Sequence, residues 1–257
     1  MIEGRAEWFR LALGLFLVFG LFHGSATILG SDRGQWGILI GLLIVAATAA
    51  ADRFLLRRPF RARQLGLGRP RTKGIAVAFG IAVVLLLVGI LFVRVTGLTA
   101  GFYPGWISLL PGLFAQAGIA EEVLFRGYLF GHIRVGRTFW RVAAVSMLPF
   151  VSVHLVLFVS MPWPIALASV LLAVVISFPL AHLFELGAET IWAPALLHFV
   201  IQATVKIAVF PRGAESFALV WMAASALIPL LVFTVKSSTH TDEDRVGVTR
   251  AISDRNC

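Results

Sequence analysis

The chain has little cysteine, few charged residues and a shortage of acidic ones, and each shortage excludes a class of protein. Its single cysteine, Cys257, excludes an internal disulfide framework and any metal site built from several thiolates. Only 14% of the 257 residues are charged and 59% are hydrophobic, whereas soluble domains have about 25% charged residues. This composition excludes an ordinary soluble protein and indicates one that is embedded in a membrane.

Basic residues outnumber acidic ones by 22 to 13, but their distribution does not indicate nucleic-acid binding. They fall between long apolar runs, as the positive-inside rule describes for membrane proteins. The segment 53–73 holds eight cations, and Arg134, Arg137 and Arg141 follow the fourth apolar run. We therefore expect these segments and both termini to be cytoplasmic, with no nucleic-acid partner. Segment 57–73 serves either as a topology signal alone or also as a contact with anionic membrane lipids.

Eight apolar runs are long enough, at about 17 to 25 residues, to cross a bilayer as helices. We expect these helices at 8–29, 36–52, 75–96, 106–130, 140–160, 164–185, 191–209 and 217–235. The seven tryptophans fall at or near the beginning of such runs, where amphipathic rings anchor among the headgroups. The sequence thus predicts an all-α, polytopic membrane protein with an integral membrane domain over 1–236. The polar residues 237–257 are predicted to be a disordered cytoplasmic tail.

Two adjacent glutamates, Glu121 and Glu122, lie within the fourth apolar run. A carboxylate near the middle of a bilayer costs about 2.5–3.5 kcal/mol, so a tandem pair there needs a partner or a function. Arg126 follows Glu122 by four residues, which makes the two side chains neighbours on a helix. Glu121 points about 100° away around the helix axis and is left available as a general base. The alternative is a purely structural Glu–Arg cluster at a helix end.

Histidines on two later apolar runs are candidates to join these glutamates. His154 ends the segment Phe150-Val-Ser-Val-His in the fifth run, and Pro149 just before it is a candidate kink. In the seventh run His198 and Gln202 are four residues apart and share one face of a helix. The amide of Gln202 is a donor of the kind that stabilises a developing oxyanion. Taken alone, each of these side chains is also explained by polar contacts between helices.

The remaining polar residues of the apolar runs are assigned no chemistry. We interpret His182 and Glu185, near the end of the sixth run, as surface residues at the cytoplasmic interface. The histidines without a matching partner also receive no role, and these are His23, His132 and His240.

The expected heights of the candidate residues in the membrane do not fully agree. At 1.5 Å per residue, Glu121 and His198 lie about 12–14 Å from the inner surface, whereas His154 comes out nearer 20 Å. Either the fifth helix begins several residues after Trp140, with 131–145 along the interface, or Pro149 tilts it. We favour the first explanation, because the arginines of that stretch suit an interfacial position.

Three motifs occur in order on three separate expected helices. They are Glu-Glu-x-x-x-Arg at 121–126, Phe-x-x-x-His at 150–154, and a histidine followed four residues later by a polar residue at 198–202. Together they resemble the CPBP family of intramembrane proteases, also known as Abi. That family includes the CAAX prenyl endopeptidases and bacterial proteins linked to bacteriocin processing and self-immunity. The resemblance covers roughly 105–209, and the remaining helices are not diagnostic.

The resemblance implies a role for each of six residues. Glu121 and His154 would activate the attacking water. His198 and Gln202 would stabilise the tetrahedral intermediate. The supporting residues would be Glu122 and Arg126. One departure is that the family commonly has asparagine or another small polar residue where this chain has Gln202, whose amide reaches one methylene further.

The family resemblance leaves the use of a metal open. The family has been described both as zinc enzymes and as glutamate-dependent proteases without a catalytic metal. If zinc is bound, a carboxylate and two imidazoles would hold it, namely Glu121, His154 and His198.

These observations predict an intramembrane endopeptidase in a bacterial inner membrane, with a buried polar site among helices four to seven. It would hydrolyse a peptide bond of a membrane-associated peptide or protein. Two alternatives stay open. One is a catalytically inactive self-immunity or scaffold protein of the same fold. The other is a proton-coupled transporter, for which intramembrane Glu, His and Arg are also typical, although no paired halves are found.

Overall fold

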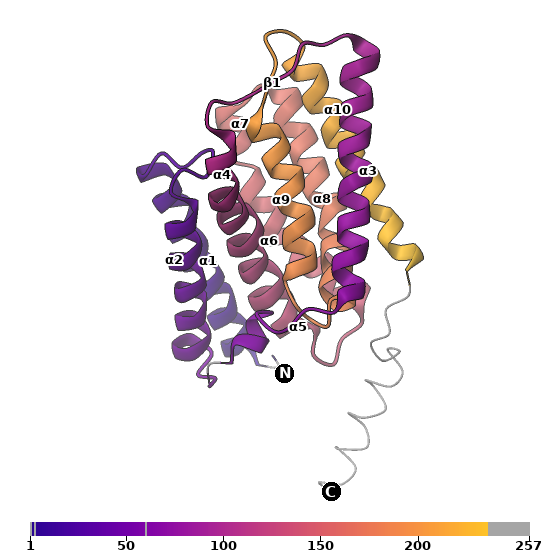
Figure 1. Cartoon of the computed structure of the whole chain (residues 1–257). Helices are drawn as coiled ribbons and strands as arrows, with labels where there is room; N and C mark the ends of the chain where they lie inside the picture. The colour runs from indigo at the N-terminus through magenta and orange to yellow at the C-terminus, as the bar shows by residue number, and fades with distance from the viewer. Residues whose placement is uncertain (1, 3, 60, 236–257) are drawn as a thin grey trace, which may run out of the picture.

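The computed structural model describes residue 2, residues 4–59 and residues 61–235, and within these it is a bundle of long helices (Figure 1). The expected tail, 237–257, lies outside the described residues. The α-helices are α1 (Arg5–Ile28), α2 (Gly37–Ala50), α3 (Thr72–Thr96), α4 (Trp106–Leu113), α5 (Gly131–Arg134), α6 (Phe139–His154), α7 (Leu157–Ser160), α8 (Trp163–Leu186), α9 (Trp192–Ile207) and α10 (Ala214–Leu227). Shorter 3₁₀ and π-helical segments are η1 (Ala51–Leu55), η2 (Ala62–Leu65), η3 (Phe114–Ala120), η4 (Val123–Phe130) and η5 (Ile228–Thr234).

Seven helical spans in the described residues are long and apolar enough to cross a membrane. They are Arg5–Ile28, Gly37–Leu55, Thr72–Thr96, Trp106–Arg134, Phe139–Ser160, Trp163–Leu186 and Ala214–Thr234. Large apolar side chains such as Phe16, Leu42 and Val159 are exposed on the outside of the bundle, where a bilayer would cover them. The predicted all-α, polytopic membrane fold is therefore confirmed.

The expected eighth span corresponds to α9, an apolar helix of only 16 residues. This is shorter than the roughly 20 residues that a spanning helix needs. It packs against α3, α8, α4 and η3 (Figure 1). About half of its residues are buried. Because neighbouring helices cover α9, it does not need the length of a lipid-exposed helix. This short central helix carries His198 and Gln202.

The fourth span is an irregular helix. Two π-helical segments, η3 and η4, interrupt it, and Glu121 and Glu122 lie between them. All eight residues of η4 are buried. π-Helical turns are rare and occur frequently at functional sites. The height estimate from the sequence assumed a regular rise, which does not hold along this span.

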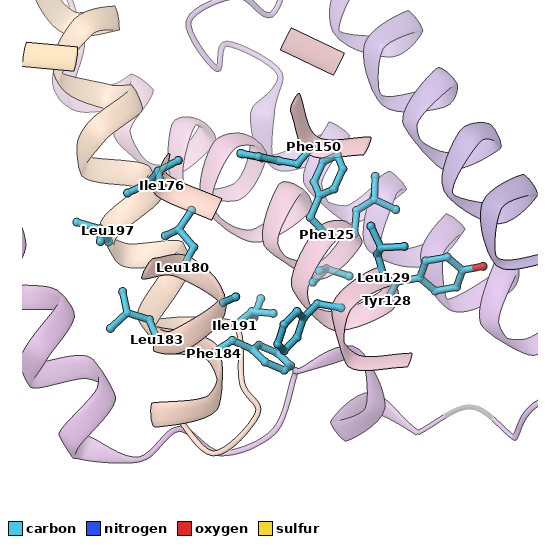
Figure 2. Packing of buried hydrophobic residues seen from close by; sticks show 14 of the residues in the cluster. Phe125, Tyr128, Leu129, Phe150, Ile176, Leu180, Leu183, Phe184, Ile191 and Leu197 are labelled. Atoms are coloured by element: carbon cyan, nitrogen blue, oxygen red, sulfur yellow. The ribbon is translucent and has the colours of Figure 1, made fainter. Parts of the chain in front are cut away.

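Close backbone contacts hold the fourth span among its neighbours. A Cβ added to Gly37 of α2 would lie 2.0 Å from the Gly112 carbonyl oxygen of α4. A Cβ added to Gly127 of η4 would lie 2.2 Å from the Leu65 carbonyl oxygen. Small residues therefore let backbones approach where larger ones would not fit. The Phe125 ring of η4 also packs edge-on against Phe150 of α6, with 5.0 Å between ring centroids (Figure 2).

The basic segment, residues 53–73, folds back against the bundle at the end where α9 begins. Leu65 is fully buried, the Ile191 amide donates to the Gly66 carbonyl at 3.0 Å, and the Trp192 indole donates to the Gly68 carbonyl at 2.8 Å. At the other end of the bundle, β1 (Gly101–Phe102) pairs antiparallel with β2 (Ala208–Val209) (Figure 1). The sequence did not predict this small sheet. We call the two ends of the bundle the basic end and the sheet end.

The explanation that the fifth helix begins late is wrong. Helix α6 begins at Phe139, and α5 continues the fourth span to Arg134, so residues 131–145 do not form a separate interfacial stretch. Two of its arginines bind protein groups: Arg134 donates to Glu185, and Arg137 donates to the Ile133 carbonyl at 2.8 Å. Arg134 and Arg137 are therefore held by the folded chain.

Two further interpretations of polar residues are corrected. Glu185 is buried in its ion pair with Arg134, so it is not a surface residue. His132, which was assigned no partner, is buried with its Nε2 2.9 Å from an Asp52 carboxylate oxygen. Both pairs join residues from different helical spans, which the sequence alone does not bring together.

Candidate active site

Glu122 lies at the centre of the buried polar cluster. Its Oε1 accepts a hydrogen bond from Arg126 Nη1 at 3.0 Å, as the four-residue spacing predicts. The same oxygen lies 2.7 Å from Nδ1 of His198, which donates to it. The side chain of Glu122 is 0% exposed and that of Arg126 is 4% exposed, so the pair is sealed from solvent. Glu122 therefore joins the fourth span to α9 as well as neutralising Arg126.

Glu121 faces the same histidine from the other side. Its Oε2 lies 3.6 Å from Nε2 of His198, so each nitrogen of that ring faces a carboxylate. At 3.6 Å the two atoms are too far apart for a direct hydrogen bond. The Glu121 side chain is 17% exposed, in contrast to the closed Glu122. Of the two glutamates, Glu121 is the one that a substrate or solvent molecule can reach.

His154 lies at the end of α6 and is half-buried. Its Nδ1 is 2.7 Å from the Phe150 carbonyl oxygen, which can only accept, so Nδ1 carries the proton of this hydrogen bond. In the neutral ring Nε2 is then a free acceptor. Glu121 and His198 lie close enough to His154 to act on its charge electrostatically. The structure thus brings residues of α6, α9 and the fourth span to one place.

Phe150 packs among these residues. Its ring centroid is 4.9 Å from that of His154 and 6.0 Å from that of His198, and the Arg126 guanidinium carbon lies 4.4 Å from it. A guanidinium over an aromatic face is favoured by the ring quadrupole. The motif Phe-x-x-x-His contains this ring, but spacing alone does not indicate that it contacts three other site residues.

Gln202 lies one turn beyond His198 on α9 and is half-buried. Within the part of the chain that the structure describes, its amide has no hydrogen-bond partner. The amide N–H groups are therefore available to an incoming ligand.

The sequence analysis did not predict the contact between Glu122 and His198, because 76 positions separate these residues along the chain.

The alternative zinc site does not fit this arrangement. Among the residues described, no three His, Cys, Asp or Glu side chains are placed to hold one metal ion. Both nitrogens of His198 face glutamates, and Nδ1 of His154 is used by a main-chain carbonyl. Free lone pairs remain on the more exposed Glu121, on Nε2 of His154 and on Nε2 of a neutral His198, but these side chains are not placed to hold one ion together as the three protein ligands of a catalytic zinc site do.

Comparison with known proteins supports the resemblance. Residues 102–204 match the family model described as type II CAAX prenyl endopeptidase Rce1-like, whereas no curated protein gives a significant match. The matched range agrees closely with the 105–209 that the three motifs indicated, and it contains all six candidate site residues. Over residues 102–204 the chain is thus similar to the type II CAAX prenyl endopeptidases, which supports the resemblance to the CPBP family of intramembrane proteases.

Proposed function

We propose that the protein is an intramembrane endopeptidase that hydrolyses a peptide bond of a membrane-associated peptide or protein. The observation that carries this proposal is the contrast between the two glutamates. Glu122 is closed off by Arg126 and His198, whereas the partly exposed Glu121 lies beside His198 and acts electrostatically on His154. A structural ion-pair cluster would need only Glu122 and Arg126, so it leaves Glu121 unexplained.

In the proposed reaction Glu121 acts as the general base, and Nε2 of His154 helps to orient the attacking water. A water proton passes to Glu121 while the oxygen bonds to the peptide carbonyl carbon, whose own oxygen becomes an oxyanion. When the tetrahedral intermediate collapses, the C–N bond breaks and Glu121 returns the proton to the leaving amine. Glu121 is thereby restored as a carboxylate.

The developing oxyanion would be held by His198 and Gln202. Nδ1 of His198 donates to Glu122, and Nε2, when it carries a proton, would be an N–H donor for an oxyanion. The unused amide of Gln202, one turn away, would supply a second donor. Glu122 and Arg126 would act by positioning the His198 ring.

The experiment that tests the proposal is Glu121→Gln, which keeps the shape of the side chain and removes its basicity. We expect cleavage of a peptide delivered in proteoliposomes to fall by about 10²–10⁴-fold, the usual contribution of general-base catalysis. Thermal unfolding in detergent should be unchanged. Glu215→Gln, at an exposed position at the start of α10, is the matched control and should retain activity. Full activity of Glu121→Gln would overturn the proposal and favour the non-catalytic binding protein.

We also propose that the reaction needs no resident metal, because the site residues do not fit a three-ligand zinc site. The expected result is that metal analysis of the active, purified protein finds no stoichiometric zinc. Prolonged chelation should leave the cleavage rate unchanged. Loss of activity on chelation that only added zinc restores would contradict this expectation.

The proposed location is a bacterial inner membrane, with the basic end of the bundle in the cytoplasm. Many cations of residues 53–73 are exposed at that end, including Arg61, Arg63 and Arg69. We propose that anionic lipid headgroups are partners of this surface. The peptide substrate would then reach the site from the cytoplasm or the inner leaflet.

A further inference from the structure

Lys206 is a charged residue near the site that the proposed reaction does not use. It lies on α9 one turn beyond Gln202 and two turns beyond His198, on neighbouring parts of the helix surface. Its side chain is half-buried. Among the described residues its ammonium has no hydrogen-bond or ion-pair partner. A cation inside a membrane bundle normally has a partner, so a ligand is the natural candidate for one here.

The charged groups around Lys206 do not supply this partner. Glu121, Asp32 and Arg33 act on its charge electrostatically, but neither carboxylate forms an ion pair with it. No described residue therefore accepts a hydrogen bond from the three N–H donors of the ammonium. The electrostatic link to Glu121 places Lys206 in the same polar region as the proposed general base.

The sheet end of α9, just beyond Lys206, is occupied by other parts of the chain. The Arg33 side chain donates to the main-chain carbonyl of Lys206, and the Tyr103 amide donates to that of Ile207 at 2.8 Å. Strands β1 and β2 pair immediately after this point. From the basic end towards the sheet end, the order along α9 is His198, Gln202 and Lys206. Lys206 is the last of the three before the sheet end.

We propose that Lys206 binds a carboxylate of the peptide substrate, on the far side of the reacting bond from the basic end. This inference rests on the proposed peptidase function. An ammonium–carboxylate pair in a medium of low dielectric constant is strong and requires the opposite charge. Lys206 then determines which peptides are cleaved, because a peptide without that carboxylate leaves the half-buried ammonium without an anion. The carboxylate comes either from the C-terminus of the peptide or from an acidic side chain.

The test uses a library of membrane-anchored peptides of random sequence in proteoliposomes, prepared with free C-terminal carboxylates or with C-terminal amides. Part of each set lacks Asp and Glu. We expect the wild-type protein to prefer carboxylate-bearing peptides, and the preferred set identifies the source of the group. Lys206→Met should raise KM for these peptides about tenfold or more, because a charge pair between protein and substrate loses one partner. It should leave kcat for fully amidated peptides without acidic residues unchanged, and Lys206→Arg should retain the preference.

Arg94→Met removes an exposed cation from the last turn of α3 and is the matched control. Equal losses on all peptides in Lys206→Met would show that Lys206 acts through Glu121 or the fold, and would overturn the proposal. Equal cleavage of all sets by the wild-type protein would do the same while leaving the peptidase function standing. If the folded wild-type protein cleaves none of them, the peptidase function itself fails. If Lys206→Met does not fold, Lys206→Gln is measured in its place. The results expected for Lys206→Met, and those that would overturn the proposal, then apply to Lys206→Gln.

Discussion

The two adjacent glutamates differ in what surrounds them, and this difference divides their roles. Glu122 uses one oxygen for both Arg126 and His198 and is fully buried, whereas Glu121 keeps partial exposure. A buried carboxylate that holds two donors fixes their positions. A carboxylate without a close donor remains able to take up a proton. Of the two neighbouring glutamates, Glu122 thus positions other side chains, and Glu121 is the proposed general base.

Glu122→Gln should lower the free energy of unfolding. The substitution removes the charge that compensates Arg126 and leaves a buried guanidinium without an anion. Breaking a buried ion pair in this way costs about 3–5 kcal/mol. We therefore expect a lower free energy of unfolding in detergent, together with reduced cleavage. Glu215→Gln should change stability by no more than about 0.5 kcal/mol, as exposed substitutions usually do. Equal stability of the two variants would contradict the central position of Glu122.

The fourth span shows how local helix geometry and packing are linked. Glu121 and Glu122 lie between two π-helical segments, and small residues on the same span allow neighbouring backbones to approach. Gly127 contacts the main chain of the basic segment at Leu65, close to the point where α9 begins. The basic segment is thus packed against the helices that carry the site.

This packing predicts the effect of Gly127→Ala. The added methyl group would meet the Leu65 carbonyl oxygen at 2.2 Å, so either the fourth span or the basic segment must shift. Overpacking of this kind costs about 1–3 kcal/mol, which a lower unfolding temperature in detergent would report. Gly80→Ala in α3 is the control, since nothing lies within 4 Å of its Cβ. A Gly127→Ala variant as stable as Gly80→Ala would show that the contact is not restrictive.

The first and last helices of the described residues begin and end, respectively, at the same end of the bundle. Helix α1 begins and η5 ends at the basic end of the bundle, while the paired strands lie at the sheet end (Figure 1). The short α9 therefore runs between the two ends like the seven longer spans, although it is shorter than a lipid-exposed helix. The eight predicted helices all occur along the chain, but one of them, α9, is shorter than a membrane-spanning helix needs to be.

The proposed orientation is tested by labelling single cysteines in a Cys257→Ser background. Arg61→Cys reports the basic end and Ala100→Cys the sheet end, and both positions are exposed. By the positive-inside rule, a membrane-impermeant maleimide should label only Ala100→Cys in cells with a permeabilised outer membrane. It should label only Arg61→Cys in inverted vesicles. The opposite pattern would reverse the proposed orientation and the route by which a substrate enters.

What could be predicted from the sequence were properties of short stretches of chain. Apolar runs indicate spanning helices because each helix satisfies its own backbone in the membrane. The four-residue spacing of Glu122 and Arg126 predicts their contact because a helix repeats every 3.6 residues. The order of the three motifs pointed to the family and to the six candidate residues.

Only the tertiary structure decided which distant groups meet. The pairs Glu122–His198, Arg134–Glu185 and Asp52–His132 join different spans. Hydropathy does not encode them, because lipid-facing and protein-facing apolar positions look alike in sequence. Burying a charge requires a partner, and that partner is found by packing helices whose contacts lie far apart along the chain. The sequence by itself thus determined a membrane bundle with a set of polar residues. Packing decided that Glu122 is enclosed, that Glu121 stays accessible and that the ammonium of Lys206 has no partner among the residues the structure describes.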